Sequence, residues 1–471
     1  MELRLAPLLT VSAFVRAGLG LAFSVLAIRV VGAGPFGYYS LAWAFCVAFL
    51  YMYTGINTVL IAALVEKRTV KSSQEWMAAG LVLTAVMVSL VAAVSAFVAA
   101  FASSSGELFL AMVVCPLMLA CQIATMFCCA LLEGRGHVAR AVLLPLVGNC
   151  GIVLVLVTSL LAGWPVTGLA SLLSVALAAF ALEAAIAVGT ALIQCAGMGK
   201  PIWRGGTVKK LLLGGCSIQA ANMVSFLLDP WSKSVLALCL GPASVAVFDL
   251  AMKVGWGLNF VFSAYSRLFL QIPPSDRERR IASLTQAADL TWAPLALVGA
   301  IAVSLLPPLM GAWLRVDQML LAQGMAMAVA ACLLMAAVSA AYISLIGFGD
   351  HAFIFRNQMI LGIANVVTAS LLVPIIGFPG AFLGSLAATI VNVALISKRL
   401  RYHMPGFSGL ASLARPFVSR LTLAIILFAV ACTASVRGSS VEIVVAVACV
   451  AFVLLVREPL ARATLKKIHG K

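Results

Sequence analysis

The stretch LFLAMVVCPLMLACQIATMFCCALL (residues 108–132) runs for 25 positions without a charged residue. A helix of about 20 apolar residues spans the hydrocarbon core of a bilayer, so this stretch is predicted to be a transmembrane helix. A helix also satisfies its own backbone polar groups, which lipid cannot do.

Similar stretches occur along the whole chain of 471 residues, of which 63% are apolar and only 10% charged. The sequence predicts an all-α integral membrane protein with about 14 transmembrane helices. Residues 8–32 are too long for a signal-peptide core and lack a cleavage pattern, so they are predicted to stay as a helix. The expected spans cover residues 8–32, 38–64, 77–101, 108–132, 141–162, 169–194, 211–240, 243–267, 290–313, 318–347, 357–377, 379–397, 417–436 and 441–456.

The cations gather in alternate gaps between these stretches. On the side of the N-terminus lie 25 of the 31 lysines and arginines, whereas the opposite loops hold only Arg315 and Arg437. By the positive-inside rule both termini are predicted to be cytoplasmic. The net charge of +16 is therefore a topology signal, and its dispersal over short loops and two tails argues against a nucleic-acid partner.

The outer loops are too short to hold a folded catalytic module. Segments such as GWPVTG (163–168) and GPAS (241–244) leave acids only at loop edges, at Glu107, Asp317 and Glu442. The twelve cysteines lie in or at the ends of apolar stretches, and the four histidines lack ligand spacing. We therefore expect no catalytic residue, no metal and no cofactor.

A loose internal repeat divides the chain. SVLAIRVVGAGPFGYYSLA (24–42) recurs as SVLALCLGPASVAVFDLA (234–251), with a Gly-Pro turn at Gly34-Pro35 and at Gly241-Pro242. Both copies keep the same orientation, which indicates a parallel repeat of two six-helix bundles around a central cavity. The expected domains are two bundles (1–200 and 201–400), followed by two additional transmembrane helices with a basic cytoplasmic tail (401–471).

Three segments resemble the polysaccharide-biosynthesis flippases of the O-antigen type. They are RVVGAGPFGYYSLA (29–42), ALLEGRGHVAR (130–140) and LLDPWSKSVLALCLGPASVAVFDLAMKV (227–254). The family belongs to the multidrug/oligosaccharidyl-lipid/polysaccharide flippase superfamily, which also contains multidrug extruders and flippases of peptidoglycan precursors. This chain departs from many relatives at Asp229-Pro230-Trp231, where they carry a basic residue after the acid, so no substrate contact is assigned to Pro230.

The resemblance implies a flippase that moves an undecaprenyl-pyrophosphate-linked oligosaccharide from the inner to the outer leaflet by alternating access, for cell-surface polysaccharides such as lipopolysaccharide or exopolysaccharide. The implied partners are the lipid-linked oligosaccharide, membrane lipids and the glycan polymerase or export machinery. Two alternatives stay open. One is a cation-coupled multidrug exporter of the same superfamily, and the other is a membrane-embedded polymerase or ligase of the same pathway.

Arg16 is the least compensated cation within an expected span. No acid lies three or four positions away, so its partner must come from another helix, from cavity water or from a ligand. We interpret it as a contact for the substrate pyrophosphate, with a structural pair to Glu183 as the alternative. Arg29 lies at the periplasmic end of the same span, where its side chain reaches the interface.

Two lysines are further candidates for the cavity and the pyrophosphate. Lys233 follows Asp229 by four residues, and Lys253 follows Asp249 by four, so that each pair can neutralise itself on one helix. Substrate binding and purely structural pairing are both consistent with this spacing. Glu183, the single acid in the middle of residues 169–194, is expected either to take up a coupling ion or to bond to a neighbouring helix.

Overall fold

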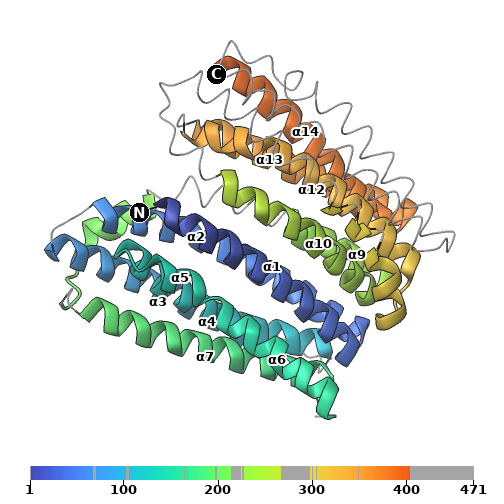
Figure 1. Cartoon of the computed structure of the whole chain (residues 1–471), viewed down its shortest axis with the longest axis horizontal. Coiled ribbons are helices and arrows are strands. Elements are labelled where there is room, and N and C mark those ends of the chain that lie inside the picture. The colour runs from blue at the N-terminus through green and yellow to red at the C-terminus, as the bar shows by residue number, and fades with distance from the viewer. Residues whose placement is uncertain are drawn as a thin grey trace, which may run out of the picture. The chain divides into compact units, whose positions relative to one another are not determined.

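The computed structural model describes residues 2–403, except for a number of gaps, and every regular element in the described part is a helix (Figure 1). The gaps are residues 67–69, 102–105, 164–165, 167, 197–198, 214–223, 225–227, 267–297, 300, 304 and 348–349. The expected spans 417–436 and 441–456 lie outside the described residues.

The helices follow the expected spans closely. In chain order they are α1 (Glu2–Val31), α2 (Ala33–Glu66), α3 (Val70–Phe101), α4 (Glu107–Gly134), α5 (Val138–Leu143), α6 (Leu146–Ala162), α7 (Leu169–Cys195), α9 (Asp229–Leu240), α10 (Pro242–Ser266), α12 (Gln318–Gly347), α13 (His351–Ile376) and α14 (Pro379–His403). Among the described residues, 8 helical segments are long and apolar enough to cross a membrane. The prediction of an all-α, multi-pass membrane protein is confirmed.

The expected span 141–162 is not one continuous helix. It is divided between α5, which ends at Leu143, and α6, which begins at Leu146. Pro145 lies at the break, because proline has no N–H for a hydrogen bond to the preceding turn and its ring clashes with that turn. The break leaves the first N–H groups of α6 without partners in their own helix.

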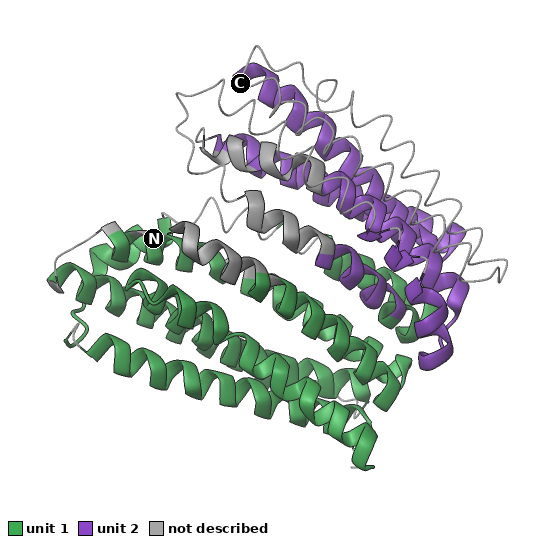
Figure 2. Ribbon diagram, viewed as in Figure 1, with its two compact units in different colours: residues 1–246 green, residues 247–471 purple. Residues whose placement is uncertain are grey.

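The chain forms two compact units, residues 1–246 and 247–471 (Figure 2). In the first unit α4 is central and packs against α2, α3 and α7, while α1 packs chiefly on α6. The face that α4 buries is apolar and includes Cys115, Met118, Leu119 and Ile123. The domains expected from the repeat, residues 1–200, 201–400 and 401–471, remain a prediction. The two units are defined by how residues pack, whereas these domains are defined by the repetition of sequence.

In the second unit α14 packs along α13 and α12. Phe248 and Phe382 are both buried, with ring centroids 4.7 Å apart, and Phe378 meets Phe382 edge to face at 5.2 Å. Gly384 lies against Thr368 and Ala369, so closely that a Cβ would come 2.9 Å from the Thr368 hydroxyl. A small residue therefore brings α13 and α14 into close contact.

The two copies of the internal repeat have the same local structure. α1 and α2 meet at Gly32, with φ 94°, and α9 and α10 meet at Gly241, with φ 85°. The expected turn at Gly34-Pro35 is wrong for the first copy, because these residues already belong to α2. Proline fits the first turn of a helix, whereas the reversal itself needs a left-handed residue, which glycine supplies.

Candidate functional site

Arg16 lies on α1 and is exposed. α1 packs on α6 and also contacts α7, and the charge of Arg16 acts on Glu183 of α7 and on Cys129 of α4. No ion pair within 4.0 Å joins Arg16 to a carboxylate of the described residues. The direct pair between Arg16 and Glu183 is not formed.

Glu183 has a different partner. Its side chain is buried, and its Oε2 atom accepts a hydrogen bond from the backbone N–H of Gly148 at 2.9 Å. Gly148 lies in the first turn of α6, directly after the break at Pro145. The carboxylate thus satisfies one of the N–H groups that the break leaves free, at the positive end of the helix dipole.

The contact between Glu183 and Gly148 requires a glycine. A Cβ at position 148 would lie 2.5 Å from Glu183 Oε2 and 3.0 Å from Phe180. Thr125 of α4, which is 1% exposed, lies beside the same carboxyl, although its hydroxyl makes no hydrogen bond of good geometry within the described part of the chain. The backbone donor and the positive end of the α6 dipole both act on this carboxyl group.

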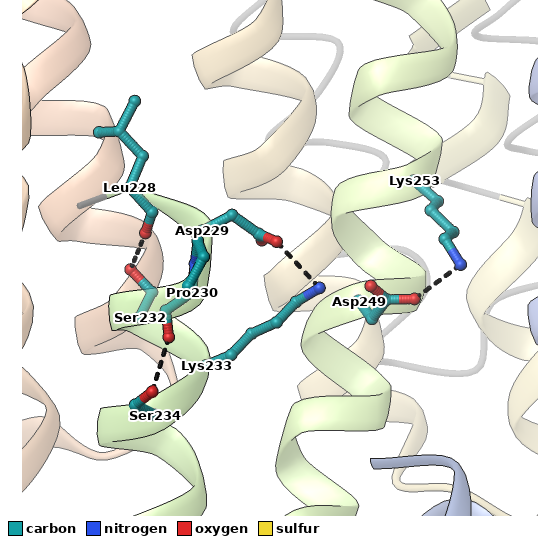
Figure 3. A network of polar contacts seen from close by, with 8 residues as sticks. All are labelled: Leu228, Asp229, Pro230, Ser232, Lys233, Ser234, Asp249 and Lys253. Atoms are coloured by element: carbon teal, nitrogen blue, oxygen red, sulfur yellow. Dashed lines mark hydrogen bonds and ion pairs between the residues drawn. The ribbon is translucent and has the colours of Figure 1, made fainter. Parts of the chain in front are cut away.

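Asp229 and Lys233 form an ion pair on α9, with Asp229 Oδ2 and Lys233 Nζ 3.0 Å apart (Figure 3). The lysine side chain is only 5% exposed, whereas the aspartate side chain is 36% exposed. Asp229 begins the helix together with Pro230, where a negative charge is favourable. In this pair the acid is therefore accessible, whereas the base is buried.

Asp249 and Lys253 form the corresponding pair on α10, with 2.9 Å between Asp249 Oδ2 and Lys253 Nζ (Figure 3). Here the acid is covered, at 9% exposure, and the lysine is 29% exposed. Of the two candidate lysines, Lys253 is the one that a ligand can reach.

Arg29 is exposed in the last turn of α1. A cation is favourable there because the carbonyl end of a helix carries partial negative charge. This position accounts for Arg29 without a ligand.

The sequence analysis missed an ionic cluster in the second unit. Asp350 accepts hydrogen bonds from Arg399 Nε at 2.5 Å and meets His403 Nε2 at 2.9 Å. The Arg399 guanidinium also lies over the rings of Phe353 and Tyr402. The hydrogen bond from Arg399 holds the pKa of Asp350 below its ordinary value, and His403 acts in the same direction against the opposing effect of burial.

A sequence signal for this cluster exists. The loop Gly134-Arg135-Gly136-His137 after α4 has a counterpart in Gly347-Phe348-Gly349-Asp350-His351 after α12, at the same place in the second half of the chain. The second segment carries the additional acid, Asp350.

The beginnings of α2 and α10 also meet within the first unit. Gly37 of α2 lies against the backbone of Pro242, so closely that any Cβ at position 37 would overlap the Pro242 carbonyl. α2 and α9 are in contact as well. A glycine near the start of α2 is thus a condition of this close packing.

Solved membrane transporters share this architecture. The lipid II flippase MurJ in an inward closed conformation superposes with a TM-score of 0.73 at 14% identity, over 96% of this chain and 99% of that one. An inward-facing MATE multidrug resistance transporter of the MOP superfamily superposes with a TM-score of 0.64 at 14% identity, over 84% of this chain and 99% of that one.

A MOP superfamily transporter from Pyrococcus furiosus, described by the reversed polarity of its binding pocket, gives a TM-score of 0.59 at 14% identity over 85% of this chain and 95% of that one. The chain has the fold of the MOP superfamily. Neither a model of a known protein family nor a curated protein sequence matches it. Its fold is one that membrane transporters and flippases use.

Proposed function

We propose that this MOP-fold protein is a flippase for an undecaprenyl-pyrophosphate-linked oligosaccharide. It moves this substrate from the cytoplasmic to the outer leaflet of a bacterial inner membrane, by alternating access, for a cell-surface polysaccharide. The observation that carries the proposal is the exposed Arg16 on an apolar helix, beside a carboxylate that is already bonded to Gly148.

The cost of Arg16 favours a role in binding. Arg16 lies within the candidate span Phe14–Val31, and a charged residue in the hydrocarbon core costs up to roughly 3 kcal/mol on insertion scales. A phosphate oxygen at about 4 Å returns roughly 4 kcal/mol at an effective dielectric constant near 20, which offsets that cost. Arg16 is exposed, as such a contact requires.

The two lysines differ in how well they are placed to bind the same substrate. Lys253 is 29% exposed, so it is the better candidate for a second contact to the pyrophosphate. Lys233 is covered, so a ligand meets Asp229 first, and sugar hydroxyls are suitable partners for that carboxylate. We assign Glu183 to the structure of the first unit, because its bond to α6 explains its burial without a coupling ion.

The comparisons support a lipid-linked substrate through the extent of the match. The superposition with MurJ takes in 96% of this chain, compared with 84% for the MATE transporter. A larger shared length is consistent with a chain of 14 transmembrane helices. The resemblance of residues 29–42, 130–140 and 227–254 to polysaccharide flippases points to the glycan-linked branch.

The alternative transport function is cation-coupled multidrug export, which the likeness to MATE transporters supports. Cationic drugs are attracted to acids in a cavity, and Arg16 would repel them. A polymerase or ligase would need acids held in long outer loops, and the sequence provides only short ones.

The orientation proposed with this function has both termini in the cytoplasm. Reporter fusions after residues 70, 205 and 471 should all report the cytoplasmic side, as the positive-inside rule requires. One fusion that reports the outer side would refute the orientation.

Deletion of the gene tests the function itself. Cells without the protein should continue to make the lipid-linked glycan and should hold it on the inner leaflet, where added periplasmic enzymes cannot reach it. Normal display of the polymer in these cells, when no redundant flippase is present, would show that the chain has another function.

A further inference from the structure

The segment that joins α7 to α9 contains a second charged feature. Gly199, with φ 74°, turns the chain at the end of α7, and residues 205–213 are helical up to the point where the described residues stop. We call residues 199–213 the connector. It belongs to the first unit, and its last residues, 211–213, are also the first residues of the expected span 211–240.

The connector is fixed against the beginning of α3. The N–H of Ile202 donates a hydrogen bond to the carbonyl of Gln74 at 3.3 Å. Arg204 Nη1 lies 3.4 Å from Glu75 Oε2, and Thr207 and Leu211 are buried. Because Gln74 and Glu75 lie where the candidate span 71–97 begins, the connector is held at the level of the membrane surface.

The outward face of the connector combines apolar and basic side chains. Trp203 is 61% exposed and Leu213 is 62% exposed, and the neighbouring cations Lys209 and Lys210 are exposed too. At about 100° per residue, Lys209, Lys210, Leu212 and Leu213 share one arc of the helix, opposite the buried Thr207 and Leu211. Lys200 adds a further exposed cation before the helix.

We propose that the connector lies on the membrane surface and binds the anionic head groups of the phospholipids around the protein. Amphipathic segments with tryptophan, leucine and lysine on one face bury their apolar groups at the head-group boundary and pair their cations with anionic lipid. The positive charge of the connector is complementary to phosphate, and its exposed indole suits the interface. The leaflet follows from the proposed orientation, whereas the binding itself does not depend on the transported substrate.

The effect of the lysines can be estimated. Each lysine near an anionic surface contributes about five-fold to the affinity, which corresponds to about 1 kcal/mol at 1.4 kcal/mol per tenfold. Neutralising two of them should therefore weaken the preference for anionic lipid by about 30-fold.

Lipid binding to the full-length protein in detergent tests the proposal. Native mass spectrometry would compare the association of phosphatidylglycerol with that of phosphatidylcholine. Lys209→Gln/Lys210→Gln should reduce the preference for phosphatidylglycerol by about 30-fold. The matched control is Arg135→Gln/Arg140→Gln, which removes one exposed cation after the end of α4 and one from α5 and should keep the preference. An equal loss in both variants, or no loss in the connector variant, would overturn the proposal.

A second measurement locates the indole. In nanodiscs that contain phosphatidylglycerol, the fluorescence of Trp203 is obtained as the difference between the emission of the wild type and that of Trp203→Phe. Brominated acyl chains should quench this fluorescence, and aqueous iodide should not. Quenching by iodide alone would place Trp203 in water and would indicate a soluble partner, against the proposal. Neither readout measures transport, so failure here is distinguishable from failure of the flippase function.

Discussion

The charges of α9 and α10 differ from those of α1 and α7 in where their partners lie. Asp229 and Lys233 are neighbours on one helix, as are Asp249 and Lys253. Glu183 is instead bonded to another helix at Gly148, and Arg16 has no ion pair among the described carboxylates. An acid and a base that pair on one helix can enter the membrane as a nearly neutral unit. Charges on different helices, such as Arg16 and Glu183, depend on the tertiary structure for their partners and are called the divided set. The divided set is therefore the better place to look for a ligand.

The largest effect on folding is expected when the partner of the buried residue in an ion pair is replaced. Lys253→Gln leaves the buried Asp249 without its cation, and such a loss costs about 3–5 kcal/mol. Asp229→Asn should act similarly, because it removes the negative charge that pairs with the buried Lys233. Expression level and thermal stability in detergent measure the effect.

Two kinds of control sharpen this prediction. Lys233→Gln should be milder than Asp229→Asn, because the acid that it leaves is 36% exposed. The double variants Asp229→Asn/Lys233→Gln and Asp249→Asn/Lys253→Gln should recover most of the stability. If a double variant is well folded but does not transport, its pair takes part in the mechanism.

A smaller effect on stability is expected at the break between α5 and α6. Glu183→Ala removes a charge-assisted hydrogen bond to the Gly148 N–H, which is worth about 1.5–3 kcal/mol. Glu183→Gln keeps an acceptor and should lose less. Thermal unfolding in detergent would measure both variants, and full stability of Glu183→Ala would contradict the capping role.

Gly148→Ala provides the complementary test of the same contact. The added Cβ would press on Glu183 Oε2, so the variant should be destabilised in the wild-type background. It should be destabilised less when combined with Glu183→Ala, because the clash is then relieved. Additive losses in the combined variant would show that the two residues do not act on each other.

The smallest effect is expected from Asp350, outside the membrane spans. Because Arg399 lowers the pKa of its carboxyl, the stabilising contribution is present at pH values above the unfolded pKa of about 4 and is lost as the pH falls through the lower, folded pKa. Asp350→Asn should lower Tm at pH 7, and its difference from the wild type should shrink below about pH 4. A difference that is constant with pH would contradict the ionic role.

Local rules predicted much of this molecule. The 25 uncharged positions of residues 108–132 correspond to α4, and four-residue spacing predicted the two ion pairs that form. Which member of each pair is buried was beyond the sequence, because burial depends on the helices packed around it. The bond from Gly148 to Glu183 joins residues 35 positions apart on different helices. Pro145 accounts for the break, which the expected span 141–162 did not include, and the acid that caps the new helix end is a tertiary feature.

The central claim concerns Arg16, and flipping by the purified protein in liposomes tests it most directly. The initial rate would be measured with a lipid-linked oligosaccharide for Arg16→Ala, for Arg16→Lys and for Arg29→Ala, which removes an exposed cation from the same helix. Losing a contact worth roughly 3 kcal/mol should lower the rate of Arg16→Ala about 100-fold, with the variant still folded. Arg16→Lys should keep part of the rate because it keeps the charge, and Arg29→Ala should keep nearly all of it. A fully active Arg16→Ala would contradict the proposed anion site.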